Sequence, residues 1–213
     1  MTSRRVVLAS SNKGKLAELK LLLTPLGLDL CLQSDLDVSD AEETGLSFIE
    51  NAILKARHAS AITGLPALAD DSGLEVDALD GRPGIYSARF ASMNNAGAGD
   101  SDNNQLLLSQ LQGISAGQRT ARFRCVLALL KHQHDPSPVI AEGTWEGTIL
   151  EAPEGEGGFG YDPLFHAPQH GCSAAQLTPD IKAKSGHRGR AMAQLQTTLS
   201  QTDKMANYFS AIQ

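Results

Sequence analysis

The chain has 213 residues, of which 41% are hydrophobic and 20% are charged, a composition typical of a globular protein rather than of a disordered, fibrous or membrane one. This length predicts one domain covering residues 1–213. The 18 basic and 24 acidic residues give a net charge of -6, which disfavours nucleic acid as a partner but still permits a local lysine site for a small phosphorylated ligand.

The cysteines and the apolar runs indicate the compartment. Cys31, Cys125 and Cys172 are odd in number and form no CxxC pair, so neither a disulfide framework nor a zinc ribbon is predicted. The apolar run 6–9 is too short for a signal peptide, and no run has the length of a membrane span. We therefore expect a cytoplasmic protein with no membrane contact.

The first third of the chain predicts alternating strands and helices. A strand over 6–9 and a turn over 10–14 precede a helix that ends near Pro25 and Gly27. Further along, the expected elements are a strand over 28–32, an acidic loop over 35–45, a helix over 48–62 and a short strand over 67–69 that ends in the segment 70–73. Ser47 and Glu50 form a capping box at the start of the second helix.

The rest of the chain mixes long strands with helices. The expected elements are a helix over 106–111, paired strands over 122–130 and 139–150, a glycine-rich loop over 155–160, a helical stretch opening at 178–180 and a closing helix over 188–210. Because no internal repeat or heptad array is present, the sequence predicts a mixed α/β domain.

The turn after the first predicted strand is a candidate phosphate site. Free backbone N–H groups and the helix dipole would face a ligand there. Lys13 and Lys15 add positive charge, the amide of Asn12 can donate, and Gly14 allows a close approach of the backbone. An ordinary turn with exposed lysines is the alternative, because the spacing is not that of a Walker loop or a dinucleotide fingerprint.

Four carboxylates form a candidate magnesium site, namely Glu42 and Glu43 in the acidic loop and Asp70 and Asp71 at a strand end. Magnesium uses one or two protein carboxylates together with substrate phosphates. A carboxylate beside the metal could also accept a proton from the attacking water. The alternative is a solvated turn and a solvated acidic face.

An aromatic segment and a basic segment are candidates for binding a nucleobase. The ring of Phe159, or that of Trp145, could cover a base, although buried core aromatics are the alternative. The segment 182–188 carries donors, including His187 and Arg188, that suit the keto oxygen of hypoxanthine or xanthine. A basic helix end that complements its dipole is the alternative there.

Six segments resemble those of one known family. They are, in chain order, Ser10-Ser11-Asn12-Lys13-Gly14-Lys15, Ala41-Glu42-Glu43-Thr44-Gly45 with Phe48-Ile49-Glu50-Asn51-Ala52, Ala69-Asp70-Asp71-Ser72-Gly73, Pro83-Gly84-Ile85-Tyr86-Ser87-Ala88-Arg89, Gly158-Phe159-Gly160-Tyr161-Asp162-Pro163, and His187-Arg188. Their order and spacing, from about residue 6 to residue 200, resemble the inosine triphosphate pyrophosphatase family in its bacterial branch.

The resemblance implies an α/β fold with an elongated central mixed sheet flanked by helices, in two lobes with a nucleotide cleft between them. It also implies a Mg²⁺-dependent hydrolase that cleaves ITP, dITP and XTP between the α and β phosphates, releasing pyrophosphate. A homodimer is the usual state of this family.

Roles follow from the resemblance position by position. Glu43 would hold magnesium, Asp71 would be both metal ligand and proton acceptor, and Ser72 and Lys55 would assist at the phosphates. The residues expected to bind the triphosphate are Ser10, Ser11, Asn12, Lys13, Gly14 and Lys15. Those expected at the base and sugar are Phe159, Gly160, Tyr161, Asp162, Lys182, His187 and Arg188.

Two motifs depart from the family pattern, which usually has Thr-Gly-Asn in the first loop and serine directly before His-Arg. Here Ser10 and Ser11 replace the threonine and the glycine, and Gly186 stands at the serine position, with Ser185 one residue earlier. The changes at Ser11 and Gly186 leave open a pyrophosphatase for another modified nucleotide. A separate alternative is a nucleotide-binding module without turnover, which the presence of both Glu43 and Asp71 disfavours.

Overall fold

The computed structural model describes residues 5–23 and 29–200. These residues form two compact units. Unit 1 comprises the described residues of 1–71, 125–143 and 188–213, and unit 2 comprises 72–124 and 144–187.

Within the described residues, the strands form one seven-stranded mixed sheet in the order β2-β1-β3-β4-β5-β6-β7. The strands are β1 (Arg5–Ala9), β2 (Asp29–Leu32), β3 (Ala67–Val76), β4 (Thr120–Leu130), β5 (Val139–Ile149), β6 (Phe165–Ala167) and β7 (Cys172–Ser173). β1 runs parallel to β2 and β3, whereas β6 runs antiparallel to β5 and β7. β3, β4 and β5 each contribute residues to both units.

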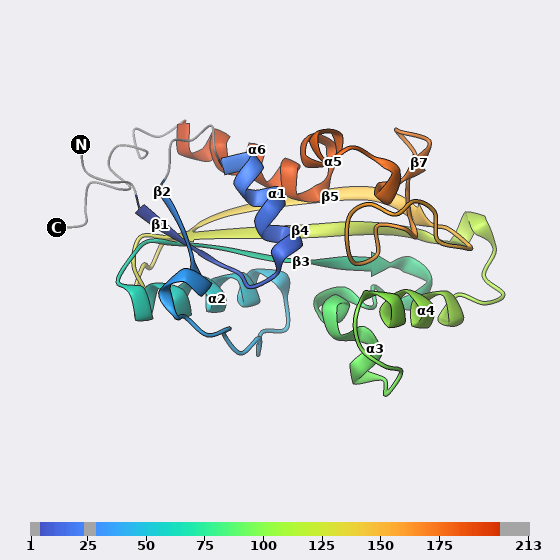
Figure 1. Ribbon diagram of the computed structural model, residues 1–213, viewed down its shortest axis with the longest axis horizontal. Helices are drawn as coiled ribbons and strands as arrows, with labels where there is room; N and C mark the ends of the chain where they lie inside the picture. Colours follow the sequence, from blue (N-terminus) through green and yellow to red (C-terminus); the bar gives the residue numbers. More distant parts are fainter. Residues whose placement is uncertain (1–4, 24–28, 201–213) are drawn as a thin grey trace. The chain divides into compact units, whose positions relative to one another are not determined.

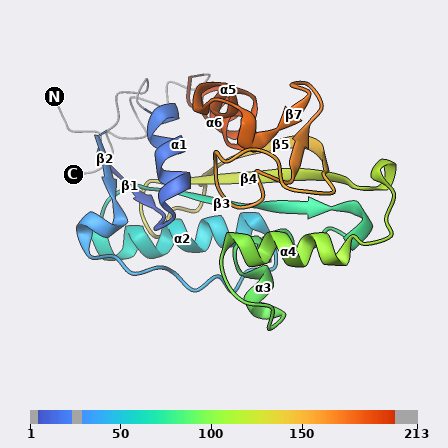
Figure 2. The same ribbon diagram turned by 45° about the vertical axis from the view of Figure 1, so that its right-hand side comes forward.

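Unit 1 packs helices on both faces of its strands. Its helical elements are α1 (Lys13–Leu23), η2 (Gln33–Leu36), α2 (Phe48–Thr63) and most of α6 (His187–Ser200). α1 and α6 lie over one face and α2 over the other (Figures 1 and 2). Leucines at positions 16, 19 and 23 of α1 are buried against Val6, Leu8 and Leu195, so the predicted leucine spacing does face a core.

Unit 2 has a separate, aromatic core. Its helical elements are η3 (Asp77–Leu79), η4 (Gly84–Arg89), α3 (Phe90–Met93), α4 (Asp100–Gln110), η5 (Ala116–Gln118), η6 (Ala174–Gln176) and α5 (Pro179–Ser185). The rings of Phe123, Trp145 and Phe165 contact one another at centroid separations of 4.6 to 6.4 Å. Leu107 and Leu111, at the end of α4, are fully buried in the same cluster.

The predicted mixed α/β fold is confirmed, and so are most of the elements. Ser47 caps α2 by accepting from the N–H of Glu50, and Gly64 ends that helix in a left-handed conformation. Two boundaries differ widely from the prediction: β3 continues to Val76 instead of ending at residue 69, and α4 begins at Asp100 instead of 106. Smaller shifts place the start of β4 at Thr120 instead of 122 and the start of α6 at His187 instead of 188. Pro25, Gly27, Leu28 and the predicted helical residues 201–210 lie outside the described residues.

Candidate functional site

The carboxyl end of β1 is the point at which the strand order of unit 1 reverses. The chain passes from β1 to β2 on one side, then returns to β3 on the other side of β1. Ala9 is the register partner of Ala69, so Ser10 and Asp70 leave the paired region together. Such a reversal, with helices on opposite faces, is where parallel α/β sheets bind ligands.

The loop 10–12 leads into α1 at this point. The Asn12 Oδ1 accepts the N–H of Lys15 at 3.0 Å, and the Ser10 Oγ accepts the N–H of Asn12 at 3.3 Å. No acidic side chain lies in the first turn of α1, and Ser11, Asn12 and Lys13 are exposed. The helix terminus therefore presents positive charge to solvent, as an anion site requires.

Ser11 fits this loop without a glycine-only backbone. Among the described residues, the non-glycine residues with positive φ are Asp37, Asp80 and Asn95. The Ser11 hydroxyl donates to Asp40 Oδ2 at 2.8 Å, and the amide of Gln33 donates to Asp40 Oδ1 at 2.6 Å. The side chain that replaces glycine thus tethers the loop to the acidic segment. No local sequence pattern predicts this contact.

Lys55 brings the two predicted metal ligands together. Its ammonium lies 3.0 Å from Glu43 Oε1 and 2.6 Å from Asp71 Oδ1. The three side chains come from different elements, because Glu43 lies in the loop before α2, Lys55 in α2 and Asp71 in β3. The two residues predicted to hold a metal, Glu43 and Asp71, therefore lie in one cluster within unit 1.

Asp70 forms a second, fully buried cluster. Its Oδ1 lies 2.9 Å from the Lys15 ammonium, and its Oδ2 accepts from Arg188 Nε at 2.8 Å and from the Cys125 thiol at 3.2 Å. Arg188 also pairs with Glu18. Arg188 is only 2% exposed, so the structure places this predicted base contact among acidic side chains of unit 1.

The pKa values of the two adjacent aspartates are shifted in opposite directions. Burial acts to raise the pKa of Asp70, but Arg188 and Lys15 outweigh it and hold that pKa well below its usual range. Burial raises the pKa of Asp71, and the attraction of Lys55 does not offset this. Burial favours the neutral amine of Lys55, yet Asp71 and Glu43 outweigh it and raise its pKa, so the ammonium stays charged.

The carboxylates of unit 1 fit a magnesium ion. Asp71 Oδ2 is buried and has no hydrogen-bond partner among the described residues, which leaves a hard oxygen available for a cation. The carboxylate of Glu43 meets the same lysine as Asp71. Two carboxylates of this kind, completed by phosphate oxygens and water, match the usual protein contribution to a magnesium site.

The predicted base-binding residues of unit 2 form a tight turn. Asp162 Oδ2 accepts the N–H of Phe159 at 2.8 Å and the Lys182 ammonium at 2.5 Å. The same ammonium lies 4.6 Å from the centre of the half-buried Phe159 ring. Tyr161 is buried, and its hydroxyl donates to the carbonyl oxygen of Ser87 at 2.8 Å. Phe159 is therefore the ring of this turn that keeps an exposed part.

His187 and Trp145 are stacked in the core of unit 2. The His187 ring lies 4.7 Å from Phe123 and 6.5 Å from Trp145, with interplanar angles of 19° and 18°. Trp145 is 0% exposed. The interpretation of Trp145 as a platform for a base is therefore wrong, and the alternative of a core aromatic holds, because its ring packs against Phe123 and Phe165.

Gly186 occupies a position with no room for a side chain. A Cβ there would lie 2.7 Å from the carbonyl oxygen of Lys182 and 3.5 Å from the Trp145 ring. Its N–H caps α5 by donating to that same carbonyl at 2.9 Å. Ser185 instead bonds to the carbonyl of Ile181 and to the ring of His170. The departure at residue 186 is thus matched to the local packing.

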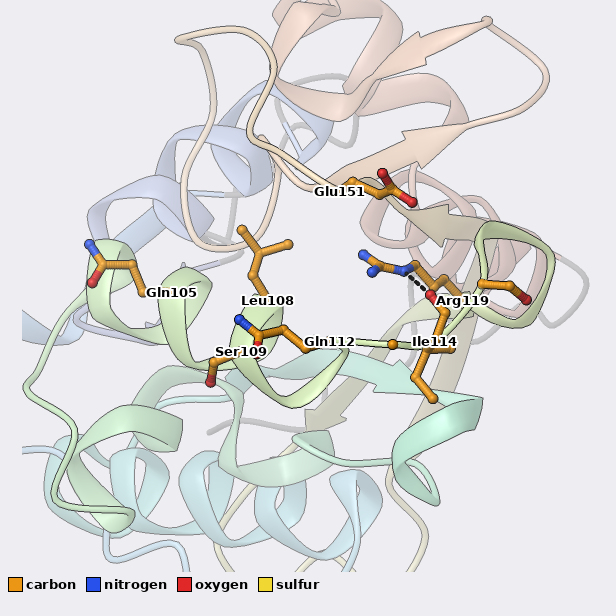
Figure 3. Close-up of a pocket in the computed structure, with 9 residues that line it drawn as sticks. Gln105, Leu108, Ser109, Gln112, Ile114, Arg119 and Glu151 are labelled. Atoms are coloured by element: carbon orange, nitrogen blue, oxygen red, sulfur yellow. Dashed lines mark hydrogen bonds between the residues drawn. The ribbon is translucent and has the colours of Figure 1, made fainter.

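A cavity of about 640 Å³ opens elsewhere on unit 2 (Figure 3). Its lining is contributed by Gln105, Leu108, Ser109, Gln112, Gly113, Ile114, Ser115, Arg119 and Glu151. Arg119 donates to the carbonyl oxygens of Leu111, Ile114 and Leu150. Because these donors hold the backbone, Arg119 is a structural residue, and the cavity contains none of the predicted site residues.

The fold and the lysine–carboxylate clusters define a class: a mixed α/β protein with a candidate anion site and a candidate cation site at the reversal point of its parallel strands. The profile of the Ham1 family matches residues 6–198. The chain belongs to the Ham1 family.

Named relatives and solved structures agree with this assignment. The dITP/XTP pyrophosphatase of Photobacterium profundum is 53% identical over 191 residues, covering 90% of this chain and 95% of that protein. The dITP/XTP pyrophosphatase of Shigella flexneri is 55% identical over 189 residues, covering 89% and 94%. A HAM1 protein structure from Coxiella burnetii superposes with a TM-score of 0.84 at 47% identity, covering 93% of this chain and 99% of that one.

The helices of the structure bear on the expectation of no membrane contact. Among the described residues, none of the helices has the length and apolar character that crossing a bilayer requires.

Proposed function

We propose that this chain hydrolyses the non-standard purine nucleoside triphosphates ITP, dITP and XTP to the monophosphate and pyrophosphate, with Mg²⁺ as cofactor. The observation that carries the proposal is the meeting of Glu43 and Asp71 on Lys55 in unit 1. Relatives that are 53% and 55% identical are dITP/XTP pyrophosphatases, which supports the same substrates here.

The reaction is attack of water on the α phosphorus. A new bond forms between the water oxygen and phosphorus, the bond to the bridging oxygen of the β phosphate breaks, and the proton passes to Asp71. The raised pKa of Asp71 suits a proton acceptor. Bound to Glu43 and Asp71, magnesium would neutralise phosphate charge and polarise the phosphoryl group.

The first loop, Lys55 and Ser72 are proposed to bind the phosphates. The residues proposed to bind them are Ser10, Ser11, Asn12, Lys13, Gly14, Lys15, Lys55 and Ser72. The N-terminus of α1 and the ammonium groups of Lys15 and Lys55 stabilise the charge that builds up on the leaving pyrophosphate.

The base is assigned to residues of unit 2. The residues proposed to bind the base and the sugar are Phe159, Gly160, Tyr161, Asp162, Lys182 and His187. The ring of Phe159 supports this role because part of it is exposed. The base contact predicted for Arg188 stays a prediction, since its Nε and one terminal nitrogen already donate to Asp70 and Glu18.

A substrate panel tests the proposal. Purified protein with Mg²⁺ is expected to release pyrophosphate from ITP, dITP and XTP much faster than from ATP, GTP or dUTP. Equal turnover of ITP and ATP would contradict the selectivity, and a preference for a modified pyrimidine would favour the alternative substrate class. Chelation of the metal is expected to stop the reaction.

The variant Asp71→Asn separates the enzyme from a binding module without turnover. We expect it to lower kcat by about 10²-fold or more, because the proton acceptor and one metal ligand are lost. Asp80→Asn is the matched control, because Asp80 is exposed in a left-handed conformation that asparagine also adopts. Pyrophosphate release unchanged in Asp71→Asn would remove Asp71 from the mechanism.

We also propose that the protein is a cytoplasmic homodimer, as the resemblance implies. The mass of the protein, measured by light scattering as it elutes from a size-exclusion column, tests the dimer. A monomeric mass at micromolar concentration would contradict it.

A further inference from the structure

Two side chains of α4, one turn apart, form hydrogen bonds with the backbone of Gly160. Asp100 Oδ2 accepts the N–H of Gly160 at 2.6 Å, and Asn104 Nδ2 donates to the Gly160 carbonyl oxygen at 2.9 Å. Residues four apart lie on the same helix face. One helix therefore fixes both peptide bonds that flank Gly160, and we call this pair of contacts the Gly160 clamp.

The clamp acts on a glycine in the left-handed region. Gly160 has φ +62, and without a Cβ its own sterics do not restrict it to this conformation. Glycine in this region interconverts readily with other conformations. Phe159 and Asp162 close the rest of the turn through the Asp162 side chain and backbone. The clamp thus selects one conformation of the turn 159–162.

The orientation of the Asn104 amide supports a role in holding the turn 159–162. Its Oδ1 is buried and has no hydrogen-bond partner among the described residues, which is unfavourable for a buried acceptor. The opposite orientation of the amide would place Oδ1 against the carbonyl oxygen of Gly160. The amide therefore takes the orientation in which Nδ2 donates to Gly160, although Oδ1 then accepts no hydrogen bond from the described residues.

We infer that Asp100 and Asn104 are positioning residues that set affinity and selectivity for the purine base by holding the Phe159 ring in place. The inference deepens the proposed function and rests on it, because the turn 159–162 is the proposed base site. Neither residue touches the base in this proposal; both act through Gly160.

Kinetics of four variants test the clamp. Asp100→Ala and Asn104→Ala are each expected to raise KM for ITP about tenfold, the effect of one lost hydrogen bond, with kcat within about twofold of wild type. The preference for ITP over ATP should fall as well. Asp100→Asn keeps an acceptor oxygen and should restore most of the affinity. Asp102→Asn is the control, because Asp102 lies on the same helix but accepts from Ala98 instead.

Hydrogen exchange gives a readout that needs no turnover. The amide of Gly160 should exchange faster in Asp100→Ala than in wild type, and at the wild-type rate in Asp102→Asn. Unchanged KM together with unchanged exchange would overturn the clamp. If wild-type protein releases no pyrophosphate from ITP, the proposed function fails, whereas the exchange rates still decide whether the clamp exists.

Discussion

Asp70 and Asp71 are neighbours in β3 that belong to different environments. Successive residues of a strand point to opposite faces. Asp70 meets Lys15 of α1 and Arg188 of α6, whereas Asp71 meets Lys55 of α2. α1 and α6 cover one face of unit 1 and α2 covers the other (Figure 1). The alternation of the strand therefore separates the paired Asp70 from Asp71, whose buried Oδ2 accepts no hydrogen bond from the described residues.

The paired state of Asp70 predicts a pH dependence of stability. Its pKa is held well below its usual range in the folded protein and is about 3.9 in the unfolded chain. Between these two values the unfolded chain binds a proton that the folded chain does not. The free energy of unfolding should therefore fall as pH falls through this interval, and the contribution should be complete above about pH 4.

Denaturant unfolding between about pH 2 and pH 7 measures this effect. Asp70→Asn should be less stable by about 3–5 kcal/mol near pH 7, because Arg188 and Lys15 lose a buried partner. Its acid slope should also be shallower than that of wild type, whereas Asp80→Asn should keep the wild-type slope. Identical slopes in Asp70→Asn and wild type would show that Asp70 does not carry the effect.

At the scale of elements, the junction of α5 and α6 explains why residue 186 is glycine. We expect Gly186→Ser, which restores the family residue, to lower the free energy of unfolding by about 1–3 kcal/mol, since the new Cβ would overlap the Lys182 carbonyl. Gly117→Ser is the control, because a Cβ there meets nothing within 4 Å. Equal stability of both variants, measured by thermal unfolding, would contradict the steric explanation.

Periodicity and capping predicted the elements that pack locally, but not those that depend on distant charges. The leucines of α1 and the Ser47 cap of α2 are visible in the sequence and hold in the structure. The extension of β3 through Asp70 and Asp71 was not predicted, because aspartate is depleted in strands and a buried carboxylate needs a partner. Here the partners come from α1, α2 and α6, which the local sequence does not reveal.

The start of α4 was missed for a related reason. Its first residues are polar, and its N-cap is Gly99, which offers no side chain to accept a hydrogen bond. The side chains of Asp100 and Asn104 form hydrogen bonds with Gly160, which lies 60 and 56 residues away in sequence. The meeting of Glu43 and Asp71 followed instead from the resemblance, since spacing alone left a solvated turn as an alternative.

The prediction that residues 1–213 form one domain stays a prediction, and unfolding tests it. We expect one cooperative transition, because β3, β4 and β5 contribute residues to both units. The single tryptophan, Trp145, reports on unit 2, and the buried thiol of Cys125 reports on unit 1. Burial and the Asp70 carboxylate raise the pKa of that thiol, so it should react only after unfolding.

Coincident midpoints of tryptophan fluorescence and Cys125 labelling across a urea series would support one folding unit. Labelling is assigned by mass spectrometry, with the half-buried Cys172 as an internal reference. Clearly separated midpoints would mean that the two units unfold independently.

The chain enters or leaves unit 1 at 71/72, 124/125, 143/144 and 187/188. No uninterrupted stretch of the gene encodes either half, so a crossover at one point cannot exchange the part bearing Phe159 while leaving the part bearing Asp71 untouched. Exchange of the proposed base site without unit 1 therefore requires two crossovers that flank 144–187, or single substitutions within that segment, where Gly160 and Gly186 lie.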